Sequence, residues 1–205
     1  LWLIGVTIVV KDYTTLNYTN GAIIHDPTDQ DTKSFSEHIN NEVIITTAYC
    51  DIEHSDTDNK ILHHCYRDQP YDTTVLINSV PLNYEIKKDD VSTSTGNLYL
   101  EFENDKGEPS GYKTVTAWQV HYWLILSGNT LYRLQAHQLY NYLDNTKCFE
   151  ATTPKYVNGK KLISTKGKIV PIENILEKVW VKTYNISNKA LSFDNLPNEY
   201  REIFK

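Results

Sequence analysis

Two carboxylates and a lysine stand at the ends of two short apolar runs in the stretch YDTTVLINSVPLNYEIKKDD, residues 71–90. Asn78 and Ser79 form a turn-prone pair between the runs, so the stretch predicts a β-hairpin. A turn centred on this pair would place Asp72 directly opposite Glu85, with their Cβ atoms roughly 5 Å apart. Because side chains alternate along a strand, Lys87 is expected on the same face as Glu85.

Two carboxylates so close repel each other, and the arrangement makes sense if a divalent cation lies between them. Mg²⁺ (or Mn²⁺) takes oxygen ligands, usually one or two carboxylates together with phosphate and water. Such a cation helps to form hydroxide and stabilises the charge that develops on phosphorus. The pattern therefore predicts Asp72 and Glu85 as metal ligands, and Lys87 as the residue that orients the attacking water. The structural alternative is a surface ion-pair cluster at the end of a hairpin.

The rest of the chain predicts an α/β protein with a mixed central sheet flanked by helices. Polar cap residues followed by apolar residues at helical spacing predict a helix over 27–44. Strands are expected at 1–10, 44–50, 97–104, 130–134 and, as an edge strand containing Pro171, at 168–172. Residues 51–70 read as loop. A helix leading into a strand is expected at 114–126, a helix at 135–145, and a strand and a helix in the C-terminal segments 175–187 and 196–205.

The spacing of Asp72 and Glu85-x-Lys87 resembles the signature of the PD-(D/E)xK, or restriction-endonuclease-like, nuclease superfamily. The order of STGNLYLEFE, GEPSGYKT, the YW pair and KGKIVPIENI after that motif is similar to small nuclease-like proteins of phages and other viruses. The resemblance implies a nuclease-like domain at 1–176, with 177–205 as an extension packed on it. It also implies a Mg²⁺-dependent DNA endonuclease in the cytoplasm, the host's if the protein is viral. The Pro-Asp pair of the signature is interrupted here, since the chain reads Pro70-Tyr71-Asp72.

Three further residues are candidates for contacting nucleic acid: Lys88, Ser110 and Lys113. Lys88 belongs to a charge run with Asp89 and Asp90 that is otherwise read as solvated, and the other two belong to a Gly-containing turn. The helix before the hairpin offers Glu37 or Glu42 as an additional carboxylate, and helical geometry favours Glu42.

A different metal site is conceivable in CDIEHSDTDNKILHHC, residues 50–65, where Cys50, His54, His63 or His64, and Cys65 would bind zinc. The spacing departs from common zinc fingers, so a solvated loop with buried thiols is the alternative. Three cysteines at irregular spacing give no disulfide framework and suit a reducing, intracellular setting.

Composition limits the kind of partner that is expected. The 205-residue chain carries a net charge of −6, so any nucleic acid must be held by a local patch rather than by a basic coat. The opening apolar run of ten residues is too short to span a bilayer. The competing class of function is a non-catalytic module that binds nucleic acid or protein on the same fold. A duplex cutter with one site per chain needs two chains for a double-strand break, so a homodimer is compatible with the enzymatic class.

Overall fold

The computed structural model describes residues 30–63, 71–114, 116–157, 160–187 and 190–192. The expected strand at 1–10 and helix at 196–205 lie outside these ranges. The protein is an α/β protein that divides into two compact units, one comprising Leu1–Ile86 and Ile186–Lys205, the other Lys87–Asn185. Within the described ranges, no helix carries an apolar stretch long enough to cross a membrane.

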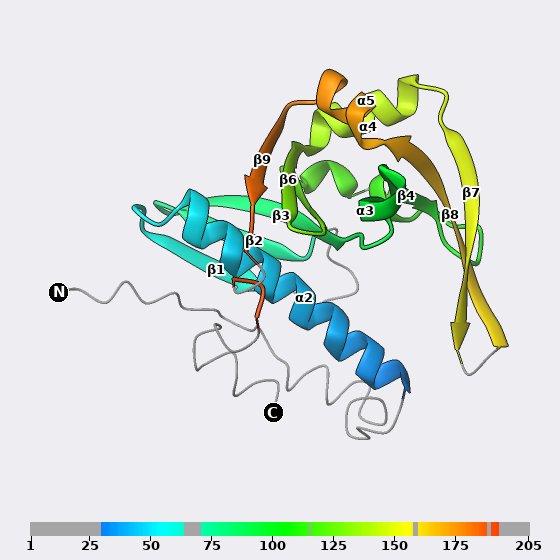
Figure 1. Cartoon of the computed structure of the whole chain (residues 1–205), viewed down its shortest axis with the longest axis horizontal. Helices are drawn as coiled ribbons and strands as arrows, with labels where there is room; N and C mark the ends of the chain where they lie inside the picture. The colour runs from blue at the N-terminus through cyan, green and yellow to red at the C-terminus, as the bar shows by residue number, and fades with distance from the viewer. Residues whose placement is uncertain (1–29, 64–70, 115, 158–159, 188–189, 193–205) are drawn as a thin grey trace. The chain divides into compact units, whose positions relative to one another are not determined.

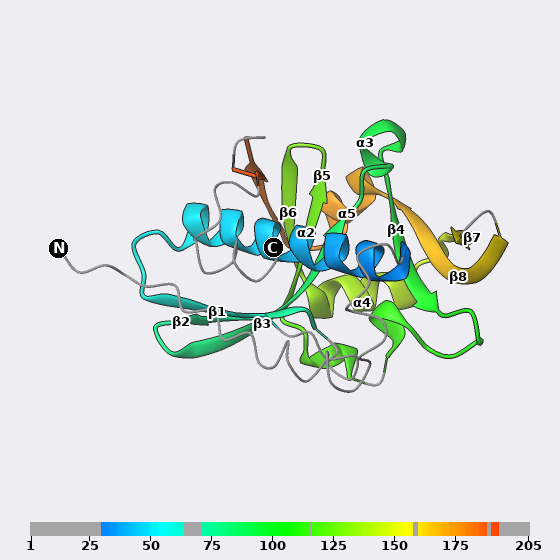
Figure 2. The same cartoon turned by 90° about the horizontal axis from the view of Figure 1, so that it is seen from below.

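The first unit combines a long helix with an antiparallel meander. Helix α2 (Gln30–Glu53) runs along one face of β1 (Asn59–His63), β2 (Thr73–Ile77) and β3 (Val80–Lys88), as both views show (Figures 1 and 2). β2 is the central strand of the three, pairing with β1 on one side and β3 on the other. Its residues Thr73, Thr74 and Val75 are all buried, so both faces of this strand are covered.

The expected strand at 44–50 is wrong, because α2 continues through these residues to Glu53. The β-branched run Ile44 to Thr47 has strand propensity, but packing overrides such a weak local preference. Ile45, Ala48 and Tyr49 are buried at helical spacing, which favours the helix. The Thr46 hydroxyl donates to the Glu42 carbonyl one turn earlier, at 2.8 Å, so its burial leaves no unpaired hydroxyl.

The expected loop at 51–70 is wrong in part. It contains the end of α2 and the strand β1, which pairs with β2 from Asn59 opposite Ile77 to His63 opposite Thr73. β1 is short, and only its partner strand makes it recognisable, since a five-residue run has little periodicity of its own. The first residue of β1 is Asn59, and its side-chain amide donates to the His54 carbonyl at 2.9 Å across the preceding turn.

The second unit contains the rest of the main sheet and a smaller sheet. The strand order of the mixed six-stranded sheet is β1-β2-β3-β5-β6-β9, with β5 at Tyr122–Ser127, β6 at Thr130–Gln135 and β9 at Val181–Asn185. Helix α4 (Ala136–Asn145) follows β6 directly, as expected, and the Trp123 indole of β5 donates to the Tyr140 hydroxyl at 2.8 Å. This bond joins α4 to the sheet through two buried aromatic side chains.

A three-stranded antiparallel sheet has the order β4-β8-β7, with β4 at Asn97–Glu103, β7 at Phe149–Val157 and β8 at Lys160–Pro171. The expected edge strand around Pro171 is therefore wrong: β8 is the central strand. Pro171 is tolerated because it is the last residue of β8, where a missing N–H costs the ladder little. Gly167 lies inside β8 because the Tyr99 ring occupies the space that a side chain would need.

Short helical segments connect the strands of the second unit. They are α3 (Ser92–Thr95), η1 (Gly111–Lys113), η2 (Ala117–Gln119) and α5 (Ile172–Lys178). The helix expected to precede the strand at 114–126 is reduced to the single turn of η2, whereas the strand itself is present as β5. Helix α5 was not expected, and it begins at Ile172 directly after Pro171, a residue that favours helix starts.

Candidate active site

The hairpin that carries the candidate residues has the register expected from the sequence. Asn78 and Ser79 form its turn, and both have positive φ, 49° and 68°, as a type I′ turn requires. Ile77 is opposite Val80 and Thr73 is opposite Tyr84, so Asp72 and Glu85 are the next residues outward on the two strands. The structure thus brings the two carboxylate-bearing residues to the same end of the hairpin.

A backbone hydrogen bond ties Asp72 to the Glu85-x-Lys87 segment. The Ile86 N–H donates to Oδ2 of Asp72 at 2.7 Å, a short distance typical of bonds to a charged acceptor. On the other side, the Asp72 N–H donates to the Tyr84 carbonyl at 3.0 Å. The Asp72 carboxylate is therefore held beside the backbone of the residue that separates Glu85 from Lys87.

Burial alternates along β3 in the expected way. Tyr84 and Ile86 are buried at 0% and 4% exposure, whereas Glu85 and Lys87 are half-buried. Side chains of successive strand residues point to opposite faces. Glu85 and Lys87 therefore share one face of the strand, and the buried pair anchors the other.

The lysine of the motif is positioned by an aromatic ring of β4. Nζ of Lys87 lies 5.5 Å from the ring centroid of Tyr99, within the range of a cation–π interaction. The Tyr99 hydroxyl in turn donates to the Thr165 carbonyl of β8 at 2.8 Å, which fixes the ring. The sequence placed Tyr99 in a strand but gave no signal that it would contact the lysine.

Helix α2 supports the strand that carries Glu85. Tyr49 of α2 and Tyr84 of β3 are fully buried, and their hydroxyl oxygens are 3.3 Å apart. The Tyr49 hydroxyl also contacts Nε2 of His54 at 3.1 Å. Glu42 lies two turns earlier in the same helix and is 5% exposed, in agreement with the geometric preference for its inward face. The side chain of Glu37 lies outside the described residues.

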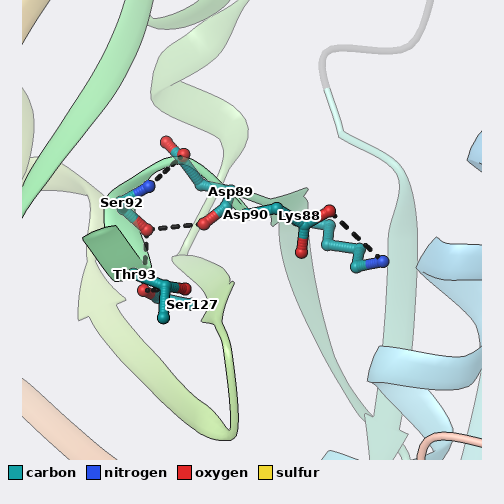
Figure 3. A network of polar contacts seen from close by, with 6 residues as sticks. All are labelled: Lys88, Asp89, Asp90, Ser92, Thr93 and Ser127. Atoms are coloured by element: carbon teal, nitrogen blue, oxygen red, sulfur yellow. Dashed lines mark hydrogen bonds and ion pairs between the residues drawn. The ribbon is translucent and has the colours of Figure 1, made fainter. Parts of the chain in front are cut away.

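The charge run after β3 is not uniformly solvated. Lys88 and Asp90 are exposed and form an ion pair at 3.4 Å, but Asp89 is only 8% exposed. Figure 3 shows Asp89 directed toward Ser92, whose N–H donates to Oδ1 of Asp89 at 3.0 Å. The Tyr99 N–H donates to the other oxygen at 3.3 Å. The expectation of a solvated Asp89 is therefore wrong, because this carboxylate satisfies backbone N–H groups at the start of α3 and β4.

Ser110 and Lys113, the other residues expected to contact nucleic acid, already make contacts within the protein. Ser110 Oγ donates to Oε1 of Glu101 at 2.5 Å. Lys113 lies 2.6 Å from Oδ1 of Asp144, and both of these side chains are partly exposed. A partly exposed ion pair of this kind contributes little stability.

The expected zinc ligands are only partly described. The pKa of the Cys50 thiol is raised to about 12. Burial is the main cause, and the neighbouring Asp51 carboxylate is the smaller one. His64 and Cys65 lie outside the described residues. Among the described residues, no group of three or more His, Cys, Asp or Glu side chains lies close enough together to hold a metal ion.

Two cavities of the second unit lie away from the candidate residues. One of about 630 Å³ is lined mainly by hydroxyl-bearing and apolar side chains of α3, β5, β6 and α5, with Glu173 at its margin. Neither this cavity nor a smaller one of about 340 Å³ is lined by Asp72, Glu85 or Lys87. No protein-family model, curated protein or solved structure matches the chain.

Proposed function

We propose that the protein is a metal-dependent endonuclease that hydrolyses phosphodiester bonds in DNA, with a restriction-endonuclease-like core formed by α2 and the β1–β3 meander. Asp72 and Glu85 are the proposed ligands of Mg²⁺ or Mn²⁺, and Lys87 is the proposed third catalytic residue. The observation that carries the proposal is the hydrogen bond from the Ile86 N–H to Asp72, because it fixes one carboxylate beside the Glu85-x-Lys87 segment.

The donor set fits a hard divalent cation. Asp72 and Glu85 supply carboxylate oxygens from adjacent strands at the same hairpin end. Mg²⁺ commonly takes one or two carboxylates and completes its octahedron with water and substrate phosphate, so a third protein carboxylate is not required. A carboxylate has about four lone-pair positions, so the bond from Ile86 is compatible with a cation on the same group. When bound, the metal would supply Lewis-acid activation of the phosphate and of water.

The chain's own residues have separate roles in this proposal. The carboxylates of Asp72 and Glu85 orient the scissile phosphate by holding its counter-ion. The Lys87 ammonium, which lies over the Tyr99 ring, donates to the attacking water or to a phosphate oxygen. Tyr84 and Ile86 keep β3 fixed from the buried face, and such placement matters because small displacements of catalytic groups lower rates steeply.

The proposal is tested by following the nicking of supercoiled plasmid with Mg²⁺, with Mn²⁺ and with a chelator. Wild-type protein should nick only with metal, and Lys87→Ala should abolish nicking while leaving the thermal unfolding curve unchanged. Lys106→Ala and Asp105→Asn are the matched controls, since both residues are exposed in the loop after β4 and should keep wild-type activity.

Two results would contradict the proposal. One is nicking by Lys87→Ala at a rate near that of the wild type. The other is no metal-dependent product from plasmid, branched or single-stranded DNA. The second outcome would favour the non-catalytic binding module on the same fold.

A further inference from the structure

A cluster of two aromatic and two cationic side chains lies on β5, β6 and the approach to β9, all within the second unit. It consists of Tyr122, Arg133, Trp180 and Lys182, called here the aromatic–cationic patch. Trp180 is 44% exposed, which is unusual for so large an apolar side chain. Lys182 is exposed as well, and the other two side chains are half-buried.

The guanidinium of Arg133 contacts both rings of the patch. Cζ of Arg133 lies 4.8 Å from the Tyr122 ring centroid and 4.9 Å from the Trp180 ring centroid. The two ring centroids are 6.2 Å apart at an interplanar angle of 55°, so the guanidinium lies beside both rings at nearly equal distances and not between them. Lys182 is the cross-strand partner of Arg133, which brings a second cation to the same patch.

The backbone of Trp180 is anchored although its side chain is exposed. Its N–H donates to Oε1 of Gln138 at 2.6 Å, and its carbonyl accepts the Gln135 N–H at 3.2 Å. Both partners lie at the junction of β6 and α4. The indole is therefore presented from a fixed position, and little conformational entropy is lost when a planar group stacks on it.

The charge of the patch is opposite to that of the protein. The chain as a whole has a net charge of −6, whereas the four residues of the patch carry two positive charges and no carboxylate. An exposed aromatic ring beside cations suits a polymer in which planar bases alternate with phosphates. A base can stack on the ring while a phosphate contacts a cation.

We infer that the aromatic–cationic patch binds single-stranded DNA, with an unpaired base stacked on Trp180 and a neighbouring phosphate contacted by Lys182. This inference rests on the proposed function and deepens it by naming a substrate class, namely DNA that contains unpaired nucleotides. Duplex DNA cannot use the patch in the same way, because its bases are already stacked on each other. A protein partner that presents an acidic surface would use the cations but not the indole.

The test measures binding of fluorescein-labelled dT12 by anisotropy in a chelator, where no cleavage occurs. Trp180→Ala should weaken binding about tenfold, and Trp180→Phe should retain most of it. Lys182→Ala should lower the slope of log K against log salt by about 0.7, the value for one phosphate on a single strand. Trp118→Ala is the matched control. Trp118 is 52% exposed in the same unit but packs edge-on against Tyr140, and its removal should leave binding unchanged.

Three outcomes would overturn the inference: no binding of dT12 by the wild type, wild-type affinity in Trp180→Ala, or an equal loss in Trp118→Ala. An equal loss of affinity for inorganic polyphosphate in Trp180→Ala would also overturn it, because polyphosphate has no bases. The binding test does not decide whether the protein cuts DNA. If dT12 binds through Trp180 but no DNA is cut with metal, the nuclease assignment fails and the binding site stands.

Discussion

Asp72 has an observed structural role and a proposed role as a metal ligand, and replacing it by Asn or by Ala distinguishes them. Its carboxylate accepts the Ile86 N–H at 2.7 Å, and Ile86 is only 4% exposed. Alanine removes the acceptor and leaves this N–H without its partner inside the hairpin. Asparagine keeps an oxygen that can accept the same N–H, but it removes the negative charge that strengthens the binding of a divalent cation.

The size of each effect follows from these contacts. Hydrogen bonds to charged groups contribute about 1.5–3 kcal/mol, and Asp72 is half-buried, so Asp72→Ala should lower the free energy of unfolding by about 2 kcal/mol. For a chain of this length that corresponds to a fall in Tm of about 4–8 °C. Asp72→Asn retains a neutral hydrogen bond and should lose less than about 1 kcal/mol. Both variants should lose at least about 100-fold in metal-dependent cleavage, since several kcal/mol of transition-state stabilisation depend on the cation.

Urea unfolding followed by circular dichroism gives the stability of each variant, and plasmid nicking with Mg²⁺ gives its activity. Cleavage of DNA by Asp72→Asn at the wild-type rate would contradict a role of Asp72 as a metal ligand in catalysis. Wild-type stability of Asp72→Ala would contradict a role of its carboxylate in stabilising the hairpin. Asp105→Asn, in an exposed loop, controls for the loss of one negative charge and should change neither quantity.

Two further predictions concern stability. Ser79 occupies a turn position with φ of 68°, so Ser79→Gly should raise the free energy of unfolding by about 0.4–1 kcal/mol in urea titrations, and a loss of stability would contradict the assigned turn. Burial raises the pKa of the Cys50 thiol from its ordinary value of 9.0 to about 12, so the unfolded chain ionises first as pH rises. The stability from the neutral thiol is then fully present below pH 9 and declines between pH 9 and 12. Cys50→Ala should make the unfolding free energy less dependent on pH between pH 9 and 12. An unchanged pH dependence would show that ionisation of the Cys50 thiol is not its cause.

Local features of the sequence were sufficient to predict the hairpin. The turn pair, the alternation around Tyr84 and Ile86 and the cross-strand register depend on neighbouring residues, and all three are present in the structure. Helix α4 and strands β4 and β6 were predictable for the same reason, since each has a strong period of its own.

The features that were missed depend on distant residues. The end of α2 is helical because Ile45 and Tyr49 are buried on one face, which the β-branched run conceals. β8 is a central strand because β4 and β7 flank it, and nothing near Pro171 in the sequence indicates both neighbours. Asp89 is buried because α3 and β4 both begin beside it, so its charge alone suggested solvent.

The same distinction applies to the site. The sequence was sufficient to propose Asp72, Glu85 and Lys87, because their spacing is local to one hairpin. It was not sufficient to find the Tyr99 ring beside Lys87 or the Tyr49 hydroxyl beside Tyr84, since each contact joins elements that are separate in the chain. Nor did it distinguish Trp180 from the other tryptophans, because exposure is a property of the folded chain.

The central claim is that Asp72 and Glu85 hold a divalent cation. Crystals soaked in Mn²⁺ and measured for anomalous scattering test it most directly, because the metal is then located without reference to activity. We expect one anomalous peak between the two carboxylates, at about 2.1 Å from their oxygens, as for a small hard cation. We expect this peak to be absent from Asp72→Asn crystals. A fully soaked wild-type crystal with no peak there, or with its only peak elsewhere, would contradict the claim.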